Sequence, residues 1–148
     1  MKLTNEYIRG LVDGEGCFTF TTTKYKKGSA IITKRIPAFA IAMNERDRGL
    51  IEAVRDHFEI KNRVYLHNPY LGDGYNRGKR SVLIVREFPA LKNVIVPFFY
   101  KKLKGHKAKQ FESWILKIGS DSAVPASFKL IHRLYISGYW DKNPKYTD

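Results

Sequence analysis

The sequence predicts an α+β fold in which helices cover one face of an antiparallel sheet. Apolar residues switch between helical spacing and strand alternation in the order helix, two strands, helix, two strands, and then further helices. Each pair of strands is joined by a polar, glycine-containing turn, which is typical of antiparallel neighbours. A sheet with helices gathered on one side leaves its other face free for a partner.

The first half of the chain is expected to form a helix and a hairpin. The helix covers Thr4–Asp13, where apolar residues have helical spacing and Thr4 can cap the first turn. Gly14 begins the segment that we expect to stop it. Strands over Phe18–Tyr25 and Ile31–Met43 form the hairpin, and Pro37 is expected to break the second strand.

The second half repeats this order. A helical face runs from Leu50 to Phe58, and strands are expected over Arg63–His67 and Lys79–Arg86. The polar stretch Asn68–Gly78 between them is typical of a long hairpin tip. Three further helices are expected, over Leu91–Tyr100, Lys107–Ile118 and Ser127–Trp140.

Length and composition favour one intracellular domain. The 148 residues suit a single domain, with a core over about 4–118 and a C-terminal helical extension over about 119–148. No apolar run reaches the roughly 20 residues that cross a bilayer, and the N-terminus resembles no targeting segment. Cys17 is the single cysteine, which excludes an internal disulfide. We expect no membrane and no small-molecule substrate.

The net charge of +13 indicates a polyanionic partner. Nucleic acid is favoured because the basic residues lie among aromatic ones along strands and loops, and no stretch forms a basic amphipathic helix. A basic surface that only maintains solubility, or one that binds anionic lipid, remains an alternative at this point.

The most specific motif lies at the end of the first predicted helix. Residues 7–18, YIRGLVDGEGCF, resemble the LAGLIDADG motif of homing endonucleases. The matching positions are Ile8, Gly10, Leu11, Val12, Asp13, Glu15, Gly16 and Phe18. Glycines in a helix let a second helix approach to backbone contact. The resemblance implies an αββαββα fold with a saddle-shaped sheet, and a homodimer interface formed by Ile8, Gly10, Leu11 and Gly14.

Glu15 is the principal catalytic candidate. A carboxylate at a helix C-terminus is electrostatically unfavourable unless a cation lies beside it. The resemblance implies that Glu15 binds a divalent metal, Mg²⁺ with Mn²⁺ as a substitute, and that Gly14 contributes a backbone carbonyl. Hard oxygen ligands suit Mg²⁺. Asp13 is expected to have a structural role at the helix end.

A second segment, residues 103–114, is similar to the part of the family that supplies a lysine near the cleavage site. Lys107 matches that position, and Lys104 is the other catalytic candidate, since the loop length leaves the register open. An ammonium group there can orient water or stabilise charge on a phosphate. Where some relatives have Gln at the end of the second strand, this chain has Met43, and Asn44 is a candidate to replace that Gln.

Strand alternation predicts which residues contact DNA. Side chains on the face opposite Phe18 and Phe20 point away from the core. Threonine and tyrosine reach base edges, lysine neutralises phosphates, and arginine does both. The candidates are Thr19, Thr21, Thr23, Tyr25, Lys34, Tyr65, His67, Arg77, Lys79, Arg80 and Arg86. A solvated sheet surface explains any one of them equally well.

The sequence therefore predicts a single-motif homing endonuclease. The stretch Tyr135–Asn143 echoes the motif but has Asn143 in place of the acid and is interpreted as a terminal helix that packs its Tyr and Trp. One acid per chain and two strand cuts imply a homodimer on a long, nearly palindromic DNA site, with staggered ends. The protein would then act inside the cell, in the compartment that holds the genome carrying its intron. The alternative is a non-cleaving RNA maturase or DNA-binding regulator of the same fold.

Overall fold

The computed structural model describes residues 1–69, 72–74 and 78–146. The helices and strands are α1 (Asn5–Glu15), β1 (Gly16–Lys27), β2 (Ala30–Asn44), α2 (Arg48–His57), β3 (Tyr65–His67), β4 (Arg80–Val85), α3 (Phe88–Ala90), α4 (Val96–Phe99), α5 (His106–Ser120), α6 (Lys129–Ile136) and α7 (Tyr139–Lys142). Within these residues, no helix is both long and apolar enough to cross a bilayer.

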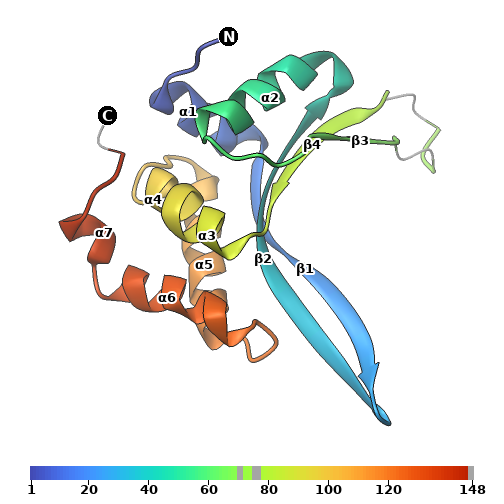
Figure 1. Cartoon of the computed structure of the whole chain (residues 1–148). Helices are drawn as coiled ribbons and strands as arrows, with labels where there is room; N and C mark the ends of the chain where they lie inside the picture. The colour runs from blue at the N-terminus through green and yellow to red at the C-terminus, as the bar shows by residue number, and fades with distance from the viewer. Residues whose placement is uncertain (70–71, 75–77, 147–148) are drawn as a thin grey trace.

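The strands form one antiparallel sheet in the order β1-β2-β4-β3, and the helices gather on one side of it (Figure 1). This confirms the predicted α+β fold with a free sheet face. Phe18 of β1 lies opposite Phe39 of β2, and both are buried against the helices. The Phe18 ring packs against Phe111 at 5.0 Å and Trp114 at 5.3 Å between ring centroids, so aromatic packing joins β1 to α5.

α1 runs further than predicted. The Thr4 hydroxyl accepts the Tyr7 N–H at 3.1 Å and caps its first turn, as expected. Gly14 does not stop the helix, which continues to Glu15, and β1 starts at the next residue. A Cβ at Gly16 would lie 2.5 Å from a Val12 methyl carbon, so the abrupt change from helix to strand requires glycine there.

The predicted break at Pro37 is wrong. β2 is continuous from Ala30 to Asn44, and Pro37 pairs with Phe20 of β1. β4 pairs with β2 only from Phe39 onward, so one side of β2 has no strand partner at Pro37. That is a position where a missing N–H is tolerated.

Two of the predicted helices are interrupted. The helical stretch around α3 and α4 contains a π-helical turn, Leu91–Ile95, just before Pro97. Proline leaves the helical carbonyl four residues before it without a donor, and the Lys145 ammonium donates to that Asn93 carbonyl at 2.7 Å. The last predicted helix is split into α6 and α7 at Gly138, whose φ of 73° is left-handed.

Candidate active site and nucleic-acid interface

Glu15 lies at the junction of α1 and β1. It is the last residue of the helix, not the first residue beyond it, and its side chain is exposed. The last turn of α1 contains no basic residue, so nothing within that turn offsets the negative end of the helix dipole. The junction therefore concentrates negative potential at one exposed carboxylate.

The structure brings Lys107 to this junction. Its ammonium donates to the carbonyl of Gly16, the residue after Glu15, and its side chain is half-buried. Lys104 is placed differently. Its side chain is exposed beside Glu6 and Gly10, along the α1 surface. Of the two predicted lysines, Lys107 is the one held at the peptide next to the candidate acid.

Asp13 links the end of α1 to the start of α5. Its carboxylate accepts the backbone N–H groups of Lys104 at 3.1 Å and Gly105 at 3.2 Å. Gly105 is the N-cap of α5 and provides no side-chain cap of its own. The contacts fit the structural role expected of Asp13, because they fix the loop that leads to Lys107.

Two further side chains of α5 attach it to β1. The Phe18 N–H donates to Gln110 Oε1 at 3.0 Å, and Trp114 Nε1 donates to the Thr19 carbonyl at 2.7 Å. The role of Gln110 was missed by sequence reasoning, since a polar helical residue beside a buried face resembles an ordinary surface position. Together these bonds fix the start of β1, and hence Glu15, relative to Lys107.

The exposed face of α1 differs from the predicted interface in one residue. Ile8 is fully buried in the core of its own chain, so its assignment to the dimer interface is wrong. Gly10 and Gly14 are exposed, and a Cβ built on either would meet nothing within 4 Å. Tyr7 is 49% exposed and completes the stripe with Leu11 at the spacing i, i+3, i+4, i+7. That spacing would have identified Tyr7 from the sequence.

The strand register places most of the predicted DNA contacts on the free sheet face. Cross-strand partners share a face, and alternate residues point the same way. Thr23 lies opposite Lys34, and His67 lies opposite Arg80. The predicted contacts that share the face are Thr19, Thr21, Thr23, Tyr25, Lys34, Tyr65, His67 and Arg80.

The remaining candidates lie at the margins. Arg86 directly follows β4 and lines a hollow of about 280 Å³ with Tyr65 and His67. Lys79 precedes β4 and is exposed. Arg77 lies outside the described residues.

The middle of the free face is more apolar than expected. Ala40 lies opposite Ile84, and Ala42 lies opposite Val82, on the same face as the polar residues. The Arg80 guanidinium, from the neighbouring strand β4, donates to the Ala42 carbonyl at 3.1 Å. Polar groups therefore gather at the two ends of the saddle.

A family model described as LAGLIDADG endonuclease matches residues 8–117. The chain belongs to the LAGLIDADG endonuclease family. The match includes the α1–β1 junction, the sheet and most of α5, and it confirms the resemblance inferred from residues 7–18. A comparison with curated protein sequences found no match.

Solved structures of LAGLIDADG endonucleases share this fold. The homing endonuclease I-TnaI is similar with a TM-score of 0.60 and 24% identity, over 93% of this chain and 88% of that one. I-LtrWI, solved bound to its target DNA, has a TM-score of 0.61 and 28% identity, over 77% of this chain but only 36% of that one. The meganuclease I-CpaMI, solved with uncleaved DNA, has a TM-score of 0.62 and 18% identity over 94% of this chain, which spans 43% of its length.

The end of β2 places Met43 and Asn44 on opposite faces of the sheet. Met43 packs against the hydrophobic core. Asn44 is on the free face opposite Arg80, and its Oδ1 accepts the Arg46 N–H at 3.0 Å. Asn44 thus shares the free face with the predicted DNA contacts, and its side-chain oxygen caps the turn after β2.

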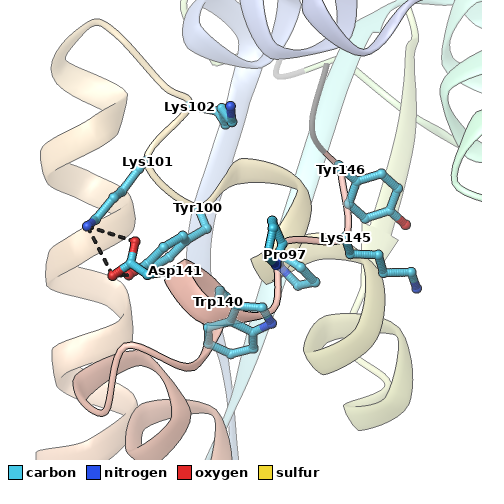
Figure 2. Close-up of a pocket in the computed structure, with 9 residues that line it drawn as sticks. Pro97, Tyr100, Lys101, Lys102, Trp140, Asp141, Lys145 and Tyr146 are labelled. Carbon is cyan, nitrogen blue, oxygen red and sulfur yellow. Dashed lines mark hydrogen bonds and ion pairs between the residues drawn. The ribbon is translucent and has the colours of Figure 1, made fainter.

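A cavity of about 280 Å³ lies away from this site, between α4 and the C-terminal extension (Figure 2). Two of its lining lysines already have partners, since Lys101 donates to Asp141 at 3.0 Å and Lys145 donates to the Asn93 carbonyl. Trp140 is buried beside Tyr100, as the interpretation of this stretch as a packed terminal helix requires. The cavity belongs to the packing of the extension against the core.

Arg9 is a second residue that sequence reasoning missed. It lies within the motif yet is buried, with its guanidinium 4.7 Å from the centroid of the Phe98 ring. Its Nε donates to the Phe98 carbonyl at 3.0 Å. The residue therefore ties α1 to α4 and orients the helix whose end bears Glu15. No pattern in the sequence marks an arginine as part of the core.

Proposed function

We propose that the chain is a site-specific, divalent-metal-dependent DNA endonuclease that acts as a homodimer. One observation carries the proposal: the exposed carboxylate of Glu15 lies at the junction of α1 and β1, and the ammonium of Lys107 donates to the carbonyl of the next residue, Gly16. A carboxylate and an ammonium group are thus held at one junction, at the start of the strand whose free face carries predicted DNA contacts.

The residues present fit a shared metal site. Among the described residues no three His, Cys, Asp or Glu side chains cluster as a self-contained site would require. Mg²⁺ keeps several waters and is commonly bound through one or two carboxylates together with substrate phosphates. Glu15 supplies one carboxylate, and the last carbonyls of α1, including that of Gly14, have no acceptor role within the helix. Mn²⁺ suits the same oxygen ligands.

The chemistry divides between the metal and the side chains. A bound divalent ion would activate water and stabilise charge on the attacking and leaving oxygens of a phosphodiester. Glu15 would hold that ion at the scissile phosphate. Lys107 would place a positive charge beside the phosphate oxygens and orient the attacking water. Its hydrogen bond to the Gly16 carbonyl would keep the ammonium next to Glu15 for this role. Lys104, exposed further along α1, would contact the phosphate backbone.

The homodimer follows from the same helix. The stripe of Tyr7, Gly10, Leu11 and Gly14 would pack against its copy across a twofold axis, with the glycines allowing backbone contact. Two copies of Glu15 would then lie together at the ends of the paired helices, one for each DNA strand. The two saddles would form one continuous surface that reads a long, nearly palindromic site and leaves staggered ends.

The test is cleavage of a randomised duplex library, first in Mg²⁺ and then in Ca²⁺, with sequencing of the cut ends and of the bound fraction. Fixed staggered cuts inside a pseudo-palindrome, seen only in Mg²⁺, would support the proposal. Sequence-selective binding without cuts in either metal would contradict it and favour a maturase or a regulator.

Variants assign the roles. Glu15→Gln is expected to abolish cleavage while binding persists, and Lys107→Met to slow cleavage more than it weakens binding. Glu112→Gln and Lys109→Met, on the exposed face of α5, are matched controls that leave the cleavage rate unchanged. Persistent cleavage by Glu15→Gln would remove Glu15 from the mechanism.

A further inference from the structure

The β1–β2 hairpin extends beyond the rest of the sheet. β1 and β2 pair as far as Lys27 and Ala30, whereas β4 pairs with β2 only from Phe39 to Asn44. Residues 19–38 thus form a two-stranded projection, here called the hairpin arm, which extends away from the sheet in Figure 1. A two-stranded ribbon is marginally stable alone, so the direction of the arm depends on contacts with other elements.

On the β2 side the arm is held by the loop between α5 and α6. The Arg35 N–H donates to the Ala123 carbonyl at 3.0 Å, where a further strand would otherwise pair. Arg35 Nη1 also donates to both carboxylate oxygens of Asp121, at 3.1 and 3.0 Å. The two side-chain bonds between Arg35 and Asp121 are called the Arg35–Asp121 clamp below.

The loop end of the clamp is itself fixed. Asp121 Oδ1 accepts the Ala123 N–H at 2.8 Å. That N–H, followed by the Arg35 guanidinium, lowers the pKa of Asp121, so the clamp is charged at neutral pH. The Lys129 ammonium donates to the carbonyls of the loop and of the end of α5: Ile118, Gly119 and Asp121. A rigid loop can therefore transmit the orientation of the helices to the arm.

The clamp acts from the face opposite the predicted DNA contacts. Arg35 pairs with Thr22, and the next rung pairs Lys34 with Thr23. Because side chains alternate along a strand, Arg35 points towards the helices while Lys34 and Thr23 point to the free face. The clamp thus lies one residue from predicted contacts but cannot itself reach DNA laid on that face.

We propose that the Arg35–Asp121 clamp is a positioning device that sets the direction of the hairpin arm and thereby its readout of the outer base pairs. The inference rests on the proposed function. Thr23 is eight residues from Glu15, or roughly 26 Å at the rise of a strand. With about 3.4 Å per base step, the arm would read positions roughly eight base pairs from the cut.

The test uses Arg35→Met, Asp121→Asn and their double variant, with Arg133→Met on exposed α6 as a control for lost charge. Asparagine can still accept the Ala123 N–H, so Asp121→Asn removes the negative charge and one of the two acceptor oxygens of the clamp and preserves the turn. The first measurement is hydrogen exchange in the free protein. Arm amides should exchange several-fold faster in all three clamp variants, while amides of β4 stay unchanged.

The second measurement is discrimination between base pairs at each position of the selected site. Both single variants should lose roughly two- to fivefold discrimination at the outer positions and none near the cut. The double variant should lose no more discrimination than either single variant, since both substitutions act on the same contact. Arg35→Lys, which keeps a cation, should restore part of the loss.

Four results would overturn the proposal or its base-readout part. Unchanged exchange in the arm would show that the clamp does not hold it. A loss spread equally over all positions, or a loss in Arg35→Met alone, would show that Arg35 acts through phosphate binding. If the wild-type protein selects no site, the proposed function fails and the base-readout role with it, while hydrogen exchange still decides whether the clamp holds the arm.

Discussion

Gly10→Ala is expected to have opposite effects on the single chain and on the dimer. Gly10 lies in the middle of α1, and a Cβ there meets nothing within 4 Å in its own chain. Alanine is about 1 kcal/mol more favourable than glycine inside a helix. For a chain of this size, that gain would raise the Tm of a monomer by about 2–4 °C.

In the proposed dimer the same methyl group would separate two helices in backbone contact. Overpacking costs about 1–3 kcal/mol at one site, and the twofold axis places two copies in one interface. A total of about 2–6 kcal/mol raises the dimer Kd by at least roughly 30-fold.

Sedimentation equilibrium measures the dimer Kd directly. Denaturation at two protein concentrations separates the stability of the dimer from the stability of the single chain. Gly49→Ala is the control, because Gly49 is exposed in the first turn of α2 and has nothing within 4 Å of its Cβ. It should stabilise the chain and leave the dimer intact. A Gly10→Ala protein that is more stable and dimerises like the wild type would refute the assignment of α1 as the interface.

Three other perturbations probe the packing around the site. Gly119→Ala should lower the free energy of unfolding by about 1–3 kcal/mol, because its Cβ would lie 2.3 Å from the His132 ring, and adding His132→Ala should reverse part of the loss in urea titrations. Trp114→Phe should cost about 1 kcal/mol by thermal denaturation, since the indole donates to a carbonyl of β1. Hydrogen bonds from Lys101 and then Tyr100 lower the pKa of Asp141, so its stabilisation is present above the ordinary value of 3.8 and lost as pH falls through the folded pKa. Between pH 5 and 2, Asp141→Asn should therefore lose less stability than the wild type.

The fold was predictable because its elements depend on local patterns. The alternation in β1 and β2 and the helical spacing in α1, α2 and α5 follow directly from which residues are buried. The errors occurred where neighbours in space decide the local structure. Pro37 is accommodated because β4 ends before reaching it, and α1 can run to Glu15 because Gly16 lets the strand start against Val12.

The active-site candidates were predictable to the extent that the motif is local. Glu15 lies within a short stretch whose order is recognisable, whereas the choice between Lys104 and Lys107 depends on how a distant loop folds back onto α1. Asp13 decides that geometry by binding the two amides before α5, which leaves Lys107 directed at Gly16. The candidate acid is thus encoded by its own segment, and the position of the candidate lysine is encoded by hydrogen bonds between residues about 90 positions apart in the chain.

The wrong assignment of Ile8 to the dimer interface arose because one helix contributes both to the core and to the proposed interface. A helix packed on its own core and on a second copy must present two apolar faces, and aligning residues to a motif does not tell them apart. Ile8 and Val12 face the core, while Tyr7 with Gly10 and Gly14 faces outward. Large apolar residues fill the core, and small ones permit approach of a partner. The two exposed glycines, more than the hydrophobicity of the residues around them, therefore distinguish the face proposed to pair from the face that folds the chain.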